Sequence, residues 1–404
     1  MSDQLITISE IEAARDRGAR VVIETPAFKS NTFSRLCGRE IWHKCENLQR
    51  AGSFKIRGAM NALSLLEEPD RAAGVVAASA GNHSQGVALA ATTLGITSTV
   101  FMPEGAPIPK IEATQQYGAK VRLVGENLGE SVDAAKEFAA QSGAHFVHPY
   151  DDRDIVTGQG TLGLELLEQI PTAATVVIPI GGGGLAAGTA TALKTIRPQT
   201  RIVGVEAAAT ATYIASRAAG TPTPVEPQFT LADGIAVARP SQLVFEHLEA
   251  YVDDIVAVDD GQMAEAVALL LERGKLLVEA AGAAPLAAVQ AGLIDESHGA
   301  TVLVLSGGNV DLLLLDQVLR HGLEAAGRYE SFAVRVPDVP GYLSKVTAAI
   351  AAADANVLSV DHGRQGIGLP FGYTEIRFAV ETRSAEHFDA MCASLAGLGF
   401  EVLL

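Results

Sequence analysis

Short apolar runs alternate with longer Ala- and Leu-rich stretches along the first three quarters of the chain. The β-branched runs predict strands at Val75–Ala78, Ser98–Met102, Lys120–Val124, Thr175–Ile180, Arg201–Glu206, Ile255–Val258 and Thr301–Leu305. The stretches at 84–94, 108–117 and 129–141 predict helices between them. Because strands that alternate with helices are typical of parallel βαβ units, we expect an α/β body over residues 1–322.

The first segment of this body predicts a helix that Ser9 caps, with Ile8 and Ile11 opening its apolar face. The stretch at 145–152, H-F-V-H-P-Y-D-D, interrupts the alternation with Pro and Asp. It predicts a crossing of the chain between two lobes.

The last quarter of the chain has a different pattern. Residues 323–331 are expected to be a linker, and residues 332–404 a separate βαββαβ unit of the ferredoxin-like kind. Its predicted strands are Phe332–Val336, Asn356–His362, Tyr373–Val380 and Phe400–Leu404, and its predicted helices are Pro340–Ala352 and Ser384–Leu395. Pro340 is expected near the first turn of its helix, and Gly397 to stop the second helix.

Composition narrows the class of protein. With 48% hydrophobic and 19% charged residues among 404, the chain is globular and long enough for two or three domains. A net charge of −17 disfavours nucleic acid or an anionic membrane as a partner. No signal peptide is visible, and the apolar runs are too short to span a bilayer. The cysteines, Cys37, Cys45 and Cys392, are few and lack metal spacing, which favours a reducing cytoplasm.

A possible reactive amine lies at the start of a predicted helix. Lys55, in S-F-K-I-R-G at 53–58, precedes the helical stretch Ile56–Leu66. The positive end of a helix disfavours a second cation, so an amine placed there loses its proton more readily. An ordinary surface lysine is the alternative interpretation.

Polar and glycine-rich turns follow several predicted strands. In S-A-G-N-H-S-Q-G at 79–86, backbone N–H groups can hold a carboxylate, or Ser and Asn can simply cap a helix. In G-G-G-G-L at 181–185, bare backbone suits a phosphate, and neither a dinucleotide fingerprint nor a Walker A loop fits. In L-S-G-G-N at 305–309, Ser306 either faces a ligand or belongs to a plain turn. Together with Lys55, these turns predict a phosphate-bearing cofactor beside a reactive lysine.

These motifs resemble those of the tryptophan-synthase-β-like, fold type II pyridoxal-phosphate (PLP) enzymes, and among them the threonine/serine dehydratases. The motifs are S-F-K-I-R-G-A at 53–59, S-A-G-N-H-S-Q-G at 79–86, E-G-A-P-I-P-K at 104–110, G-Q-G-T at 158–161, the tetraglycine, A-D-G-I-A-V at 232–237, V-E-A-A-G-A-A at 278–284 and S-G-G-N at 306–309. The resemblance implies two α/β lobes, with a smaller lobe of about 50–148 inserted in a larger one. The tail, V-P-D-V-P-G-Y-L-S-K at 336–345 with N-V-L-S-V-D-H at 356–362, resembles an ACT regulatory domain.

The same resemblance implies a role for each site residue. Lys55 carries PLP covalently, Phe54 packs beside its ring, Asn82 bonds its 3′-oxygen and Ser306 meets its pyridine nitrogen. The residues that bind its phosphate are Gly181, Gly182, Gly183, Gly184 and Leu185. The residues that clasp the substrate carboxylate are Ser79, Ala80, Gly81, Asn82 and His83.

The resemblance further implies a reaction. We expect dehydration and deamination of L-threonine, and of L-serine, to 2-oxobutyrate or pyruvate and ammonia, with Lys55 as general base. A neutral Ser306 at the ring nitrogen weakens the cofactor as an electron acceptor, which favours early loss of the β-hydroxyl. The choice between threonine, serine and a bulkier β-hydroxy amino acid is not fixed by motifs. A homodimer or homotetramer is expected, with isoleucine or valine as effectors near Pro340 and Gly341 of the tail; an oligomerisation module without ligand is the alternative.

Other functions share some of these features. Serine racemases place a second serine where this chain has Ala80, which cannot transfer a proton. Cysteine-synthase-like β-replacement and a non-catalytic amino-acid sensor are further alternatives. No metal site is expected; Glu206 is a weak candidate, because Thr212 stands near where the relatives place a second carboxylate, and Glu206 equally suits a capping role. Glu279 either approaches the ring or pairs with an arginine.

Overall fold

The computed structural model describes residues 5–295, 299–364 and 369–404. These residues form two compact units, Met1–Leu315 and Asp316–Leu404. Within the described residues, no helix is long and apolar enough to cross a bilayer.

The larger lobe of the first unit is built on a six-stranded sheet in the order β1-β2-β10-β7-β8-β9. Its strands are β1 (Ala27–Lys29), β2 (Ile41–Cys45), β7 (Ala173–Pro179), β8 (Arg201–Ala207), β9 (Asp254–Val258) and β10 (Ala300–Leu305). All neighbouring pairs are parallel except β1 with β2. The lobe's α-helices are α1 (Ile8–Gly18), α2 (Asn31–Leu36), α8 (Arg153–Gln169), α9 (Gly184–Ile196), α10 (Thr212–Ala219), α11 (Gln242–Tyr251), α12 (Asp260–Leu269) and α13 (Ala280–Gln290).

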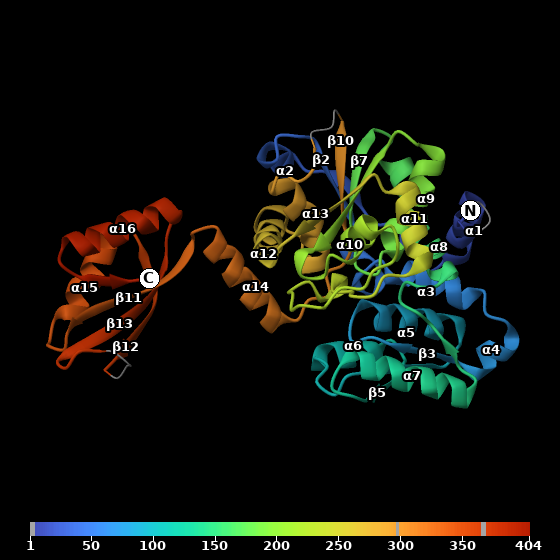
Figure 1. The fold of residues 1–404 in the computed structure, drawn as a ribbon, viewed down its shortest axis with the longest axis horizontal. Coiled ribbons are helices and arrows are strands. Elements are labelled where there is room, and N and C mark those ends of the chain that lie inside the picture. Colours follow the sequence, from blue (N-terminus) through green and yellow to red (C-terminus); the bar gives the residue numbers. More distant parts are fainter. Residues whose placement is uncertain (1–4, 296–298, 365–368) are drawn as a thin grey trace. The chain divides into compact units, whose positions relative to one another are not determined.

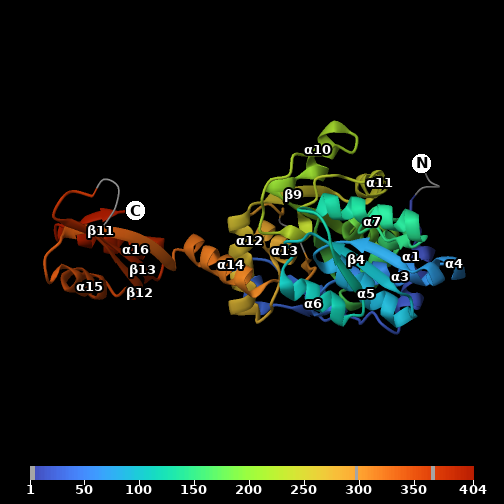
Figure 2. The same ribbon diagram turned by 90° about the horizontal axis from the view of Figure 1, so that it is seen from below.

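The smaller lobe has its own parallel sheet in the order β5-β4-β3-β6. Its strands are β3 (Val75–Ala78), β4 (Ser98–Met102), β5 (Lys120–Leu123) and β6 (His145–Phe146), and its helices are α3 (Lys55–Ser64), α4 (Glu68–Ala73), α5 (Asn82–Leu94), α6 (Ile108–Gln116) and α7 (Leu128–Ser142). Figure 1 shows this lobe below the larger one, and Figure 2 shows it from beneath. The chain returns to the larger lobe through residues 147–152, the part of the predicted crossing at 145–152 that follows β6.

The central strands could be predicted from the sequence because they are completely buried. Every residue of β3, β4 and β10 is buried, because helices cover both faces of a parallel sheet and its strands become continuous apolar runs. The predicted α/β architecture with two lobes is confirmed.

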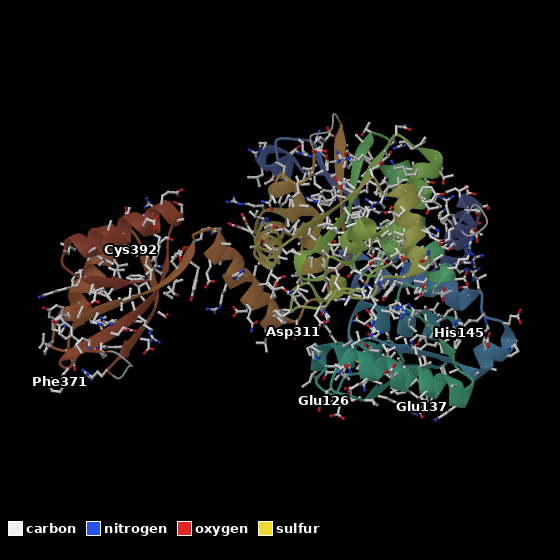
Figure 3. The ribbon with its side chains drawn as sticks, viewed as in Figure 1. Glu126, Glu137, His145, Asp311, Phe371 and Cys392 are labelled. Carbon is white, nitrogen blue, oxygen red and sulfur yellow. The ribbon has the colours of Figure 1, made fainter. Side chains whose placement is uncertain are left out.

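The second unit is an antiparallel sheet in the order β12-β13-β11-β14, covered by helices. Its elements follow the predicted βαββαβ order: β11 (Tyr329–Pro337), α15 (Tyr342–Ala352), β12 (Asn356–Gly363), β13 (Tyr373–Glu381), α16 (Ala385–Gly397) and β14 (Glu401–Leu403). Phe332 and Phe378 stack in its core with ring centroids 5.6 Å apart. Cys392 of α16 and the fully exposed Phe371 are labelled in Figure 3.

The expected linker at 323–331 contains regular structure. Helix α14 (Leu312–Ala325) covers its first residues and β11 its last ones. Asp311, labelled in Figure 3, accepts the N–H groups of Leu313 and Leu314 and so caps α14. Only residues 326–328 of the expected linker therefore lie outside regular structure, because the helix that Asp311 caps runs into it and β11 begins within it.

Helix ends differ from the prediction in three places. Thr7, rather than Ser9, caps α1 through a reciprocal capping box with Glu10. Pro340 lies outside α15, because Gly341, at φ 97°, occupies the capping position. Helix α16 includes Gly397, and Gly399, at φ 89°, makes the left-handed turn that follows.

Candidate active site

Lys55 is the first residue of α3, and its amine is buried between the lobes. Its Nζ donates to the backbone oxygen of Pro149 at 3.1 Å and lies 5.1 Å from the ring centroid of Phe54. Burial lowers the pKa of this amine to about 8, although the carboxylate of Glu279 opposes the shift. An amine in this environment is partly uncharged near neutral pH, as a nucleophile and base must be.

A buried charge network anchors the helix that carries Lys55. Arg57 donates to Glu46 at 2.7 Å and to Glu165 at 2.6 Å, and Lys44 donates to Glu165 at 2.5 Å. These groups come from β2, the turn that follows it, α3 and α8, so they join both lobes. Because two cations face two carboxylates, the network is balanced, and loss of one member leaves a buried charge unpaired.

The glycine loop at 181–184 has room for backbone only at its first three positions, 181–183. A Cβ atom at Gly181 would lie 2.7 Å from the Cα of Ile235, and one at Gly182 would overlap the ring of Tyr150. Gly183, at φ 79°, caps α9, and the structure shows no side chain that caps this helix. The N–H groups of its first turn are therefore left for an anion.

The turn at 79–81 leads into a second helix N-terminus without a side-chain cap, that of α5. Gly81 occupies the capping position of α5 without a side-chain cap, and the Ser79 hydroxyl accepts the N–H of Gly81 at 3.1 Å. Ala80 lies in the turn between them, whereas Asn82 and His83 belong to the helix. His83 Nε2 lies 3.0 Å from the backbone oxygen of Val147, which occupies this ring nitrogen. Burial lowers the pKa of His83 to about 3, so its ring is neutral.

Ser306 contacts the residue before Lys55, and Asn82 contacts Glu279, whose charge acts on Lys55. Ser306 is buried at the end of β10, and its backbone oxygen accepts the N–H of Phe54 at 3.1 Å. Asn82 donates to Glu279 Oε1 at 2.7 Å. Glu279 therefore faces the site and forms no ion pair with an arginine in the described part of the chain. Burial and Asp233 raise the pKa of Glu279 to about 8, so it is mainly protonated at neutral pH.

Two motifs that carried no assigned role meet across the edge of the site. Lys110, from the motif at 104–110 in the smaller lobe, forms an ion pair of 2.7 Å with Asp233, from the motif at 232–237 in the larger lobe. This pair links the lobes beside Glu279.

Glu206 is occupied by backbone groups. Its two carboxylate oxygens accept the N–H groups of Tyr213 at 2.8 Å and Ile214 at 2.9 Å, which caps α10. The hydroxyl of Thr212 donates to Val237 O at 2.6 Å. Among the described residues, no group of three His, Cys, Asp or Glu side chains is arranged to hold a metal ion.

The donor set fits pyridoxal phosphate. The site offers a buried amine of lowered pKa, a glycine loop at a helix N-terminus, a neutral hydroxyl and an amide. Tyr150 and Asn309, which also contact these groups, were missed in the sequence. The position of Tyr150 after a proline in the predicted crossing was the one sequence signal that could have pointed to it.

Family comparisons agree with this geometry. A family described as "Pyridoxal-phosphate dependent enzyme" matches residues 19–307, and the ACT domain family matches residues 331–390. The chain is 46% identical over 392 residues to the L-threonine ammonia-lyase of Geobacter sulfurreducens, covering 97% of this chain and 98% of that protein. It is 42% identical to the L-threonine ammonia-lyase of Thermotoga maritima, covering 98% and 99%. Among solved structures, maize serine racemase matches 79% of this chain and 98% of its own, at 35% identity and a TM-score of 0.74.

Proposed function

The chain belongs to the pyridoxal-phosphate dependent enzyme family, and on that premise we propose that it is an L-threonine ammonia-lyase. It converts L-threonine to 2-oxobutyrate and ammonia, and L-serine to pyruvate and ammonia. The observation that carries this proposal is 46% identity across 97% of the chain to an L-threonine ammonia-lyase, together with a buried Lys55 beside an uncapped glycine loop.

Each site residue has a physical task in this reaction. Bound pyridoxal phosphate supplies the electron sink for charge that develops at the substrate Cα. The backbone of residues 181–185 holds its phosphate, and Phe54 packs beside its ring. The uncharged amine of Lys55 removes the Cα proton, which its lowered pKa permits near neutral pH. The turn at 79–81 and the first N–H groups of α5 hold the substrate carboxylate.

Ser306 sets how strongly the cofactor withdraws electrons. A buried hydroxyl at the pyridine nitrogen donates or accepts a hydrogen bond but brings no charge, whereas a carboxylate would favour a protonated ring. Ser306 would thus keep the bound cofactor a weaker electron sink, which would favour early loss of the β-hydroxyl.

Racemisation is the second candidate, because the fold is shared with maize serine racemase. A racemase needs an acid–base group on each face of the substrate Cα. In this chain the position of the second serine is held by Ala80, which has no titratable group. Chiral analysis of L-serine after incubation with the enzyme should therefore show consumption without formation of D-serine.

The ACT domain supports an amino-acid effector site. A cavity of about 270 Å³ lies where the loop from β11 to α15 meets β12 and β13, lined among others by Asp338, Gly341, His362 and Arg364. This volume is below the range of drug-sized pockets and suits a small ligand. Asp338 and Arg364, 3.1 Å apart, offer both charges to an amino acid. Isoleucine or valine is the proposed effector, and titration calorimetry without heat from either would leave a purely structural role.

The cysteines fit a reducing compartment. Cys37, Cys45 and Cys392 are all unpaired, and burial raises the pKa of Cys45 to about 12. We place the enzyme in the cytoplasm as a homodimer or homotetramer on these grounds and on the prevalence of symmetric assemblies.

A product assay tests the proposed function. The purified yellow enzyme is incubated with L-threonine, L-serine and bulkier β-hydroxy amino acids, and 2-oxo acid is measured. Formation of 2-oxobutyrate from L-threonine at the highest kcat/KM is expected. Absence of 2-oxo acid from every substrate would contradict the proposal.

A further inference from the structure

The side chain of Asn309 connects three segments of the chain around the candidate active site. Its Nδ2 lies 2.6 Å from the backbone oxygen of Ala51, 2.9 Å from Oδ1 of Asn82 and 3.2 Å from Oε1 of Gln85. Ala51 precedes the Lys55 motif, Asn82 and Gln85 belong to α5, and Asn309 itself ends the motif at 306–309. The residue therefore touches both lobes.

These contacts fix which way the Asn309 amide points. The backbone oxygen of Ala51 can only accept a hydrogen bond, so the atom of Asn309 that faces it must be the nitrogen. Gly52 leaves room for the Asn309 carbonyl on the other side, because a Cβ atom there would overlap it. The orientation is thus imposed by the backbone.

The orientation of the Asn309 amide fixes the orientation of the Asn82 amide. Because Asn309 presents N–H groups, the atom of Asn82 that faces it must be the oxygen, at 2.9 Å. The nitrogen of Asn82 is then turned the other way, where it donates one hydrogen to Glu279 Oε1 at 2.7 Å. Gly307 makes room for this contact, since a Cβ atom at Gly307 would overlap Glu279 and lie 3.2 Å from the Asn82 nitrogen. One hydrogen of the Asn82 amide remains for a ligand oxygen.

We propose that Asn309 is a positioning residue that holds the nitrogen of Asn82 toward the cofactor's 3′-oxygen. This inference rests on the proposed role of Asn82 at that oxygen. If the amide of Asn82 were reversed, its oxygen would face the cofactor oxygen, and two acceptors would oppose each other. Asn309 acts on the cofactor only through Asn82, so it is not itself a catalytic residue.

Equilibrium dialysis of the holoenzyme against graded pyridoxal phosphate tests the proposal, with the dissociation constant as the readout. Asn309→Asp keeps the shape but replaces the donor by an acceptor. Loss of one oriented hydrogen bond is expected to weaken cofactor binding about tenfold. Asn309→Ala serves as a second variant if the aspartate variant does not fold. Asn61→Asp is the matched control, since Asn61 is a buried asparagine of α3 that also donates to a backbone oxygen, that of Asp154.

The double variant separates positioning from general support of the fold. In the Asn82→Ala background, Asn309→Asp should cause no further loss of affinity, because the residue through which it acts is gone. A tenfold loss that persists in that background, or a loss equal to that of Asn61→Asp, would overturn the proposal. If Asn82→Ala itself leaves the dissociation constant unchanged, the assigned role of Asn82 is wrong, and the inference falls with it.

Discussion

The Nζ of Lys55 lies 3.1 Å from the backbone oxygen of Pro149, where the chain returns from the smaller lobe to the larger one. The next residue, Tyr150, lies against Gly182 and Gly184 of the glycine loop. The crossing segment therefore touches both the Lys55 amine and the glycine loop. It brings together groups that are more than a hundred residues apart in the sequence.

Substitution of Lys44 should lower the stability of the fold, whereas substitution of Lys55 should not. Lys44 is paired with Glu165, whereas Lys55 makes no ion pair within the described part of the chain. Lys44→Met should reduce the free energy of unfolding by about 3–5 kcal/mol, because it leaves buried carboxylates unbalanced. Lys55→Met should leave stability unchanged or higher and abolish turnover. Denaturant unfolding and the oxo-acid assay, applied to both variants, check this; equal destabilisation by both would contradict it.

The pKa of Lys55 should be measurable in cofactor-free enzyme. Acylation of its amine should rise with pH around a midpoint of about 8, below the range of ordinary lysines. At that midpoint Glu279, whose own pKa is about 8, is partly ionised and stabilises the ammonium form, so Glu279→Gln should move the midpoint to lower pH. Peptide mapping after pulsed acylation gives both values. A midpoint that is unchanged or higher in Glu279→Gln would show that the two groups do not interact.

Adjacent glycines of the loop offer a matched pair of substitutions. Gly182→Ala places a methyl group in the ring of Tyr150, whereas Gly184→Ala places one at an ordinary 3.5 Å from the Cβ of Tyr150. Gly182→Ala should weaken pyridoxal phosphate binding at least tenfold, and Tyr150→Ala should restore part of it by removing the obstacle. Gly184→Ala should bind nearly as the parent does. Retention of the bound cofactor after gel filtration measures the difference, and equal effects at both positions would refute the steric explanation.

His43 should make stability depend on pH. Both of its ring nitrogens are buried without a hydrogen-bond partner in the described structure, and burial lowers its pKa to about 4. Because the unfolded state takes up the proton at a higher pH than the folded state, stability is lost as pH falls from about 6.5 to about 4, by about 3 kcal/mol. His43→Leu should flatten this dependence, whereas substitution of the exposed His321 by Gln should not. A parallel acid loss in His43→Leu would count against the assignment.

The sequence pattern predicted those strands that consist of continuous apolar residues. Strands β3, β4 and β10 are continuous apolar runs, and their burial needs no particular partner. Strand β2 was missed because it contains His43 and Lys44, and Lys44 is buried only through its pairing with Glu165, over a hundred residues away. A local sequence pattern does not reveal a partner that lies so far away along the chain.

Helix α8 was missed for a related reason. It contains glycines that lower helix propensity, yet Gly160 lets it approach α9, where a Cβ atom would lie 3.0 Å from the backbone oxygen of Gly188. In the site, Lys55 and the glycine loop could be proposed from the sequence because each lies in a compact motif. Asn309 was not, because its partners Ala51, Asn82 and Gln85 meet only in the folded chain.

Every role proposed for the site depends on Lys55 being the residue joined to pyridoxal phosphate. Borohydride reduction of the yellow holoenzyme fixes that linkage, and digestion with mass spectrometry locates it. We expect a phosphopyridoxyl group on Lys55 and on no other lysine. A group on a different lysine, or a reduced protein without any such group, would contradict it.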